Sequence, residues 1–193
     1  MTNATMVGRP PKSKQHLSKE LILWTALPIV QKMGADALSF RVLANELKVT
    51  PMAVTYHSGS KRQLLADLVN FAFTHTLPEL DETHPAARAR TIVSAYYDRA
   101  LPNANLLRAM LADTSLISED LVTLTNALKA CTQQLNDGDR DNVLLHLLVD
   151  YTHGFVLSAA STEDNPLTIE DFLRGIDWML ARATDQEATN EEY

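Results

Sequence analysis

Residues 38–65, LSFRVLANELKVTPMAVTYHSGSKRQLL, carry the signals of two short helices, a tight turn between them and the start of a third helix. Ser39 is a suitable N-cap for the first helix, and Thr50 followed by Pro51 is an N-cap with proline at the first position of the second. Ser60 begins a capping-box pattern that starts the third helix directly afterwards. The stretch therefore predicts a helix, a turn and a helix, with another helix close behind.

Within this stretch, the residue spacing lets the two short helices cross closely. Ala44 is small enough to allow the crossing, Lys48 lies four residues on in the turn, and Val54 faces back into the junction. A DNA-reading helix-turn-helix needs this arrangement, because its second helix must be held at a fixed angle before it enters a major groove. The alternative is an ordinary corner between two helices, since short patterns of this kind recur by chance.

The second short helix is the candidate recognition helix. Its outer side chains are able to touch thymine methyls, base edges or phosphate oxygens, and they are Pro51, Met52, Ala53, Thr55, Tyr56 and His57. Backbone phosphates are expected to be held by residues at helix starts and beside the recognition helix, namely Ser39, Thr50, His57 and Lys61.

The residues from the end of the first predicted helix to the start of the helix after the recognition helix match a known pattern. The matching residues are Gly34, Leu38, Ser39, Arg41, Leu43, Ala44, Leu47, Val49, Thr50, Val54, His57, Lys61, Leu64 and Leu65. This set resembles the DNA-binding domain of TetR-family transcriptional regulators. That family's pattern is a first helix ending in Gly, then Leu-Ser/Thr-x-Arg, Leu-Ala, a Gly-Val-Ser turn, Leu-Tyr-x-His-Phe, Lys and Leu-Leu. The resemblance covers about a quarter of the chain, and it implies that Arg41, Thr55 and Tyr56 contact bases.

Three positions depart from the family pattern. Lys48 stands where the family has Gly, and a left-handed conformation there costs a lysine about 1 kcal/mol. Thr55 replaces the usual Tyr and Ser58 the usual Phe or Val, while Tyr56 supplies an aromatic ring one position later. The base preference of a relative therefore does not transfer to this chain.

The net charge of −7 is unevenly distributed along the chain. Residues 1–62 contain nine Lys or Arg and three Asp or Glu, whereas the other 131 residues contain eight and 21. This split favours a basic end pressed against phosphate and an acidic body held away from it. The overall acidity thus does not exclude a nucleic-acid partner.

Composition and helix breakers divide the 193 residues into five parts. We predict a flexible basic arm over 1–17, a helix-turn-helix DNA-binding domain over 18–77, a linker over 78–85, a ligand-binding and dimerisation domain over 86–184, and a disordered tail over 185–193. The arm either lies along DNA or is a plain solvated tail.

The first helix is predicted from Ser18 to Met33, with Met33 facing inward. Pro28 lies inside this helix and is expected to cause a kink or a break.

No stretch shows strand-like alternation, so we predict an all-α fold with five helices after the linker. The segment 140–160 is apolar nearly all round, which is typical of a helix covered on two sides. The segment 167–183 carries one apolar stripe, with Trp178 on the opposite side. We expect these two helices to pair with a second copy in a four-helix bundle, as in TetR-like regulators, through Leu148, Phe155 and Trp178.

The larger domain also offers candidates for a small-molecule site. Its aromatic and sulfur side chains and few buried charges indicate a lipophilic effector, and the candidates are Tyr96, Tyr97, Met110, His146 and Phe155, with Trp178 beside them. These side chains equally suit a hydrophobic core. His146 and His153 share a helix face and either meet a ligand or metal, or are hydrogen-bonded residues of a helical interior or subunit contact.

No HExxH, phosphate-cradling glycine loop or nucleophile elbow is present, so we predict no catalytic residues, no cofactor and no metal site. No segment approaches 18 consecutive apolar residues, and the first 15 residues lack the apolar core of a signal peptide. We therefore expect a cytoplasmic protein without a membrane partner.

Together these features predict a homodimeric, ligand-responsive transcriptional regulator, a repressor that a small molecule releases from a palindromic double-stranded DNA operator. Two alternatives stay open. One is a ligand-binding protein of the same fold in which Lys48, Thr55 and Ser58 have abolished specific DNA binding. The other is a helical enzyme or carrier whose helix-turn-helix resemblance is accidental.

Overall fold

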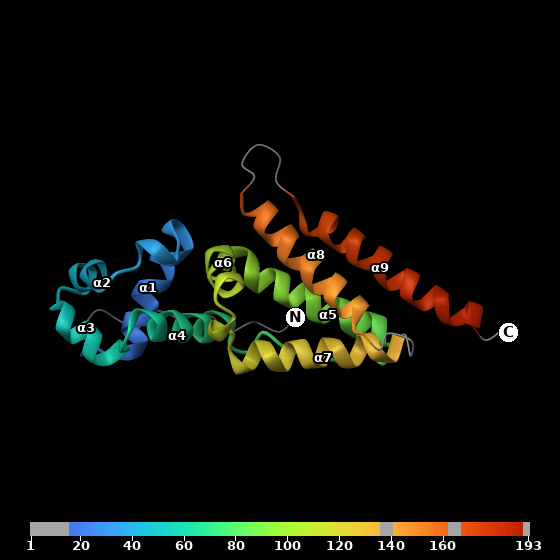
Figure 1. Cartoon of the computed structure of the whole chain (residues 1–193), viewed down its shortest axis with the longest axis horizontal. Helices are drawn as coiled ribbons and strands as arrows, with labels where there is room; N and C mark the ends of the chain where they lie inside the picture. The colour runs from blue at the N-terminus through green and yellow to red at the C-terminus, as the bar shows by residue number, and fades with distance from the viewer. Residues whose placement is uncertain (1–15, 136–140, 162–166, 191–193) are drawn as a thin grey trace.

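The computed structural model describes residues 16–135, 141–161 and 167–190, with only the backbone given for 185–190. The regular structure in these ranges is helical, as the sequence predicts. Four helices form one end of the molecule (Figure 1): α1 (Lys19–Met33), α2 (Phe40–Leu47), α3 (Pro51–Ser58) and α4 (Lys61–Phe73). The other five form the larger part: α5 (Pro85–Ala100), α6 (Ala104–Ala112), α7 (Glu119–Leu135), α8 (Val143–Ala159) and α9 (Ile169–Asn190). Short 3-10 turns join some of them: η1 (Ala35–Ala37), η2 (Leu101–Asn103) and η3 (Thr114–Leu116).

The first four helices begin at residues whose hydroxyl oxygens cap the backbone. Ser18, Ser39, Thr50 and Ser60 each accept a hydrogen bond, at 3.1 to 3.2 Å, from the backbone N–H of the third residue on. Each cap satisfies an amide that the first turn of a helix leaves unpaired. The predicted starts of α2, α3 and α4 are therefore confirmed.

α1 runs without a break through Pro28 and ends at Gly34, as predicted for its C-terminus. Ile22, Ala26 and Val30 are fully buried along its inner face. Packing before and after Pro28 therefore holds the turn in which the proline lacks an amide hydrogen. The predicted inward position of Met33 is wrong, because its side chain is 56 % exposed.

The two parts of the molecule share one continuous core, in which α1 packs on α6 and α4 packs on η3 and α7. Polar contacts also cross the junction. The Asn105 amide donates to the carbonyls of Val30 and Gln31 at 3.2 and 2.9 Å, and the Asp120 carboxylate accepts from the Thr74 hydroxyl at 3.0 Å. α6 and α7 therefore contact α1 and α4, the two helices that pack against α2 and α3.

In the larger part, α5 lies between α7, α8 and α9, and α9 runs along the outer side of α8 (Figure 1). α9 continues to Asn190, so it extends into the segment for which the sequence predicts a disordered tail. Residues 185–190 contain no Pro or Gly that would end the helix. The rest of the predicted tail and residues 1–15 of the predicted arm lie outside the described residues. None of the described helices is both long and apolar enough to span a membrane.

Candidate DNA-binding surface and ligand cavity

α2 and α3 cross tightly at small and apolar side chains. Ala44 is 2 % exposed, and Leu43 and Val54 are fully buried. Lys48 ends α2 in the left-handed conformation, with φ 56° and ψ 43°, and the Val49 N–H donates back to the Ala44 carbonyl at 3.0 Å. This is the hydrogen bonding of a helix end that normally takes glycine, so a lysine here holds the same turn geometry under strain.

Lys48→Gly is expected to raise the free energy of unfolding by up to about 1 kcal/mol, because glycine adopts the left-handed region without a clash at Cβ. Denaturant unfolding measures the change. Lys48→Ala is the matched control, since it removes the charge and keeps Cβ, and we expect it to leave stability nearly unchanged. Equal effects of the two substitutions would show that charge, and not backbone strain, governs this position.

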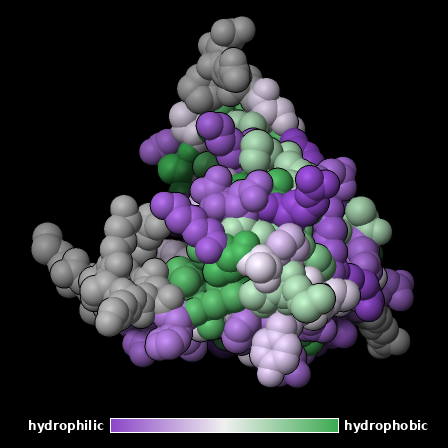
Figure 2. Space-filling view, turned by 90° about the vertical axis from the view of Figure 1, so that its left-hand side faces the viewer, coloured by the Kyte–Doolittle hydropathy of each residue, from purple (hydrophilic) through white to green (hydrophobic). Residues whose placement is uncertain are grey.

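The outer face of α3 is open to solvent. Met52 and Tyr56 are 82 % and 85 % exposed, and the rings of Tyr56 and His57 meet edge to face at 5.2 Å. Thr55 donates its hydroxyl hydrogen to the Pro51 carbonyl at 3.0 Å, which leaves its methyl group and oxygen lone pairs for a partner. Figure 2 looks onto this end of the molecule, where hydrophilic side chains surround smaller apolar areas. The buried Ser58 instead bonds within its own helix.

All ten residues predicted to contact DNA lie on α3 or at the starts of α2, α3 and α4. Nine of them are exposed and Ala53 is half-buried. Arg62, which no sequence motif marks as a contact residue, lies beside Lys61 and forms a salt bridge to Asp113 of the larger part at 3.3 Å. In the sequence, only its position next to Lys61 draws attention to Arg62. The salt bridge itself could not be predicted, because Asp113 is distant in the chain.

The larger part contains an apolar cavity of about 270 Å³, here called the inner cavity, between α5, α6, η3, α7 and α8. Tyr96 and Met110, two of the predicted ligand residues, line it, and so does His153. The Tyr96 hydroxyl and His153 Nε2 lie 3.0 Å apart and form a polar pair on the wall. No Lys, Arg, Asp or Glu lines this cavity among the described residues. A bound molecule would therefore meet a mainly apolar wall with one neutral hydrogen-bonding pair.

Four other predicted ligand residues do not line this cavity. Tyr97 and Phe155 instead belong to an aromatic cluster, in which Tyr97 stacks on Phe172 with ring centroids 4.6 Å apart. His146 is exposed on α8, and Trp178 is 64 % exposed on α9. The cluster fills space that the sequence could assign equally to a core or to a pocket.

Burial keeps the polar pair of the cavity uncharged. It lowers the pKa of His153, an effect that the nearby Asp150 carboxylate partly offsets. It also raises the pKa of Tyr96 well above its usual range. Both groups therefore stay neutral in the folded chain at neutral pH, and an uncharged or weakly polar ligand fits them best.

His153→Gln is expected to weaken the pH dependence of stability between about pH 7.5 and about pH 5.5. In the wild type the lowered pKa means that, as pH falls below the ordinary value of 6.5, the unfolded chain binds the proton first and stability declines. Chemical denaturation at several pH values measures this slope. His146→Gln, at an exposed histidine on the same helix, should keep the wild-type slope, and equal slopes for all three proteins would contradict the assignment.

The outer faces of α8 and α9 expose apolar side chains that could meet a second copy. Val143 and Leu147 on α8 are 55 % and 52 % exposed, and Trp178 on α9 is 64 % exposed. Leu148, predicted at this surface, is wrong because it is fully buried in its own chain. Phe155 likewise packs inward against Tyr151 and the neighbouring rings. Leu147, one position from Leu148, is the residue that faces outward.

The sequence matches no model of a known protein family, and it matches no curated protein. The fold, in contrast, matches solved structures along most of the chain. BioQ from Mycobacterium smegmatis is 20 % identical, with 88 % of this chain and 99 % of that chain covered at a TM-score of 0.71. Apo ActR from Streptomyces coelicolor is 19 % identical, with 90 % and 97 % covered at a TM-score of 0.70.

A third match is a single-substitution variant of TetR from Acinetobacter baumannii AYE, which is 23 % identical, with 86 % of this chain and 96 % of that chain covered at a TM-score of 0.66. ActR is itself described as a TetR family protein. The chain therefore has the fold of the TetR-family transcriptional regulators.

Proposed function

We propose that this chain is a homodimeric transcriptional regulator, a repressor that binds a palindromic operator and leaves it when a lipophilic small molecule enters the inner cavity. The observation that carries the proposal is the exposed outer face of α3, braced by α2 at the basic end of the chain. Solved neighbours support it, since BioQ has been crystallised with its natural double-stranded DNA operator and ActR with (S)-DNPA. The TetR variant from Acinetobacter baumannii AYE has been crystallised with minocycline.

On DNA, α3 would enter the major groove. Arg41, Thr55 and Tyr56 would meet base edges, and phosphates would be held by Ser39, Thr50, His57 and Lys61. Two copies of α3 must lie about 34 to 36 Å apart to reach successive major grooves on one side of the duplex. A dimer therefore reads two half-sites, and its affinity depends on how far apart the two α3 helices are held.

The inner cavity and the DNA-binding end share the elements that would carry the signal. Met110 of α6 and Leu121 of α7 line the cavity, and these two helices also contact α1 and α4. A ligand that favours a different position of α6 would act on α4 through η3, which contacts both helices, and would change the spacing of the two α3 helices. The ligand lowers the affinity for DNA to the extent that it binds the arrangement that does not fit the operator more tightly than the arrangement that does.

Selection of binding sites from a random pool of duplexes tests this proposal. We expect the ligand-free protein to enrich one palindromic sequence, with half-site centres about 10 bp or a multiple of that apart. Enrichment of single half-sites would remove the dimer from the proposal. A pool that stays random after repeated rounds would contradict specific DNA binding altogether.

Lys61→Ala is expected to make the slope of log affinity against log salt concentration shallower by about one unit per subunit, because one phosphate contact and its released counterion are lost. Fluorescence anisotropy with a labelled duplex across a salt series measures the slope. Arg99→Ala is the control, since Arg99 is an exposed cation on α5, outside the helix-turn-helix. An unchanged slope for Lys61→Ala would remove Lys61 from the DNA-binding surface.

A further inference from the structure

α3 lacks the side chains that most often read guanine and adenine. Its sequence, PMAVTYHS, contains no Arg, Lys, Asn or Gln. Arg and Lys are the usual partners of guanine in the major groove, and Asn and Gln are those of adenine. If α3 enters the major groove, as proposed above, it must therefore recognise bases by another kind of contact.

Two largely apolar side chains stand out from α3 instead. Met52 and Tyr56 are both strongly exposed, and both lie on the side of the helix opposite the buried Val54. They are four residues apart, so their side chains are neighbours on the helix surface. The rings of Tyr56 and His57 meet edge to face, which restricts the positions that the Tyr56 ring can take.

Thr55 adds a methyl group beside these two side chains. It is exposed, next to Tyr56 and three residues from Met52. Its hydroxyl hydrogen is donated to the Pro51 carbonyl at 3.0 Å, so it is not available to a base. Met52, Thr55 and Tyr56 are here called the outer ridge of α3. The apolar group that a base pair presents in the major groove is the C5 methyl of thymine, so the outer ridge matches thymine.

The charges around the outer ridge suit DNA as its partner. Arg41, Lys48 and Lys61 are exposed, and Glu46 is the one carboxylate between residues 39 and 61. At this end of the molecule, hydrophilic side chains surround smaller apolar areas (Figure 2). Cations beside a ridge that enters a groove lie toward the phosphates on either side of it. Contact with methyl groups would then remove the apolar surface of the ridge from water.

We propose that α3 reads its half-site through the C5 methyl groups of thymines, which Met52, Thr55 and Tyr56 contact in the major groove. This inference rests on the proposed function, because it requires an operator. Arg41, at the start of α2, then supplies the base contact made by hydrogen bonds. The half-site contains at least one thymine whose methyl group sets the preference at its position.

Replacement of thymine by deoxyuridine in the selected operator tests this inference, because deoxyuridine lacks only the C5 methyl and keeps the hydrogen-bonding groups. We expect at least one half-site position at which the change raises the dissociation constant about three- to fivefold, and on the order of tenfold when both half-sites carry it. With cytosine placed at that position, 5-methylcytosine should bind more tightly than cytosine by a similar factor. Deoxyuridine between the half-sites is the control and should have no effect.

Variants of the outer ridge assign the methyl contact to the protein. Met52→Ala and Thr55→Ser each remove an apolar contact, and Thr55→Ser keeps the hydroxyl group, so both should reduce the loss caused by deoxyuridine. Met33→Ala is the matched control, because Met33 is an exposed methionine at the end of α1, and it should keep the full loss.

Two results would overturn the inference while leaving specific DNA binding in place. One is an operator that the wild type binds specifically but in which deoxyuridine has no effect at any half-site thymine. The other is a loss that stays the same in wild type, Met52→Ala and Thr55→Ser at every sensitive position. A chain that selects no operator would overturn the inference and the proposed function together.

Discussion

Trp178→Ala is expected to raise the dissociation constant of the dimer about tenfold or more. Trp178 is 64 % exposed and lies on the side of α9 opposite the buried Phe172 and Ile176. The Arg182 guanidinium is 5.6 Å from the centre of its ring and leaves much of the indole open. Loss of a tryptophan anchor at an interface typically costs on the order of 2 kcal/mol or more, which is more than a tenfold change.

Sedimentation of wild type and Trp178→Ala across a dilution series measures this effect. Val122→Ala is a suitable control, because Val122 is also an exposed apolar residue, at 49 %, but lies on α7. Trp178→Ala should also weaken operator binding at low protein concentration, since only a dimer holds two half-sites at once. A wild-type chain that sediments as a monomer at micromolar concentration would contradict both the interface and the palindromic operator.

Arg41→Ala is expected to cost about 1 to 3 kcal/mol of operator binding and to relax the preference at one operator position. Arg41 is exposed near the start of α2 and forms no salt bridge with any described residue. Its guanidinium is therefore available to donate two parallel hydrogen bonds to a guanine. Binding of a set of single-base operator variants measures both the loss of affinity and the loss of preference.

Arg41→Lys separates base reading from phosphate contact, because lysine keeps the charge but cannot form the planar two-bond contact. If Arg41 reads a guanine, Arg41→Lys loses the preference at the same position as Arg41→Ala. If Arg41 holds only a phosphate, Arg41→Lys keeps most of the affinity, and Arg41→Ala weakens all operator variants equally. The second result would remove Arg41 from the base-reading set.

The helix-turn-helix could be predicted from the sequence because its signals are local. The cap residues Ser39, Thr50 and Ser60 lie within three residues of the amides they bond. The left-handed position at Lys48 could be expected from the family pattern, and the structure has it. In such a stretch, each residue type specifies a backbone conformation that depends on few distant contacts.

The larger part could be predicted only as a set of helices. α8 is apolar on nearly all sides, so periodicity could not tell that Leu148 faces inward and Leu147 outward. For the same reason His146, which is exposed, could not be distinguished from His153, which pairs with Tyr96 in the inner cavity. The choice between a filled core and a cavity depends on how five elements pack, and no local pattern records it.

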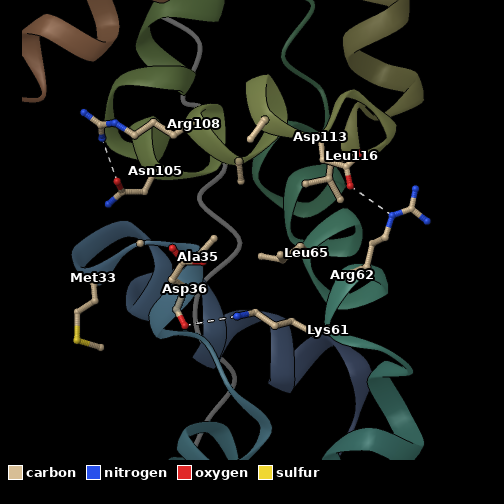
Figure 3. Close-up of a pocket in the computed structure, with 13 residues that line it drawn as sticks. Met33, Ala35, Asp36, Lys61, Arg62, Leu65, Asn105, Arg108, Asp113 and Leu116 are labelled. Carbon is tan, nitrogen blue, oxygen red and sulfur yellow. Dashed lines mark hydrogen bonds and ion pairs between the residues drawn. The ribbon is translucent and has the colours of Figure 1, made fainter.

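A cavity of about 610 Å³ at the junction of the two parts (Figure 3) had no sequence signal. Its wall combines residues 33–36, 61–65 and 105–116, which only the packing of α6 on α1 and of α4 on η3 brings together. The exposure of Met33 has the same origin, since the apolar spacing of α1 continues to it while the neighbouring helices leave a gap there.

The most direct test of the central claim is a mobility-shift titration of the purified chain with the DNA upstream of its own reading frame, repeated over a salt series. The proposed function predicts a discrete complex that a scrambled duplex of the same length does not compete away, with an affinity that falls steeply as salt rises. A chain that binds the upstream and scrambled duplexes equally at every salt concentration, or binds neither, would contradict it.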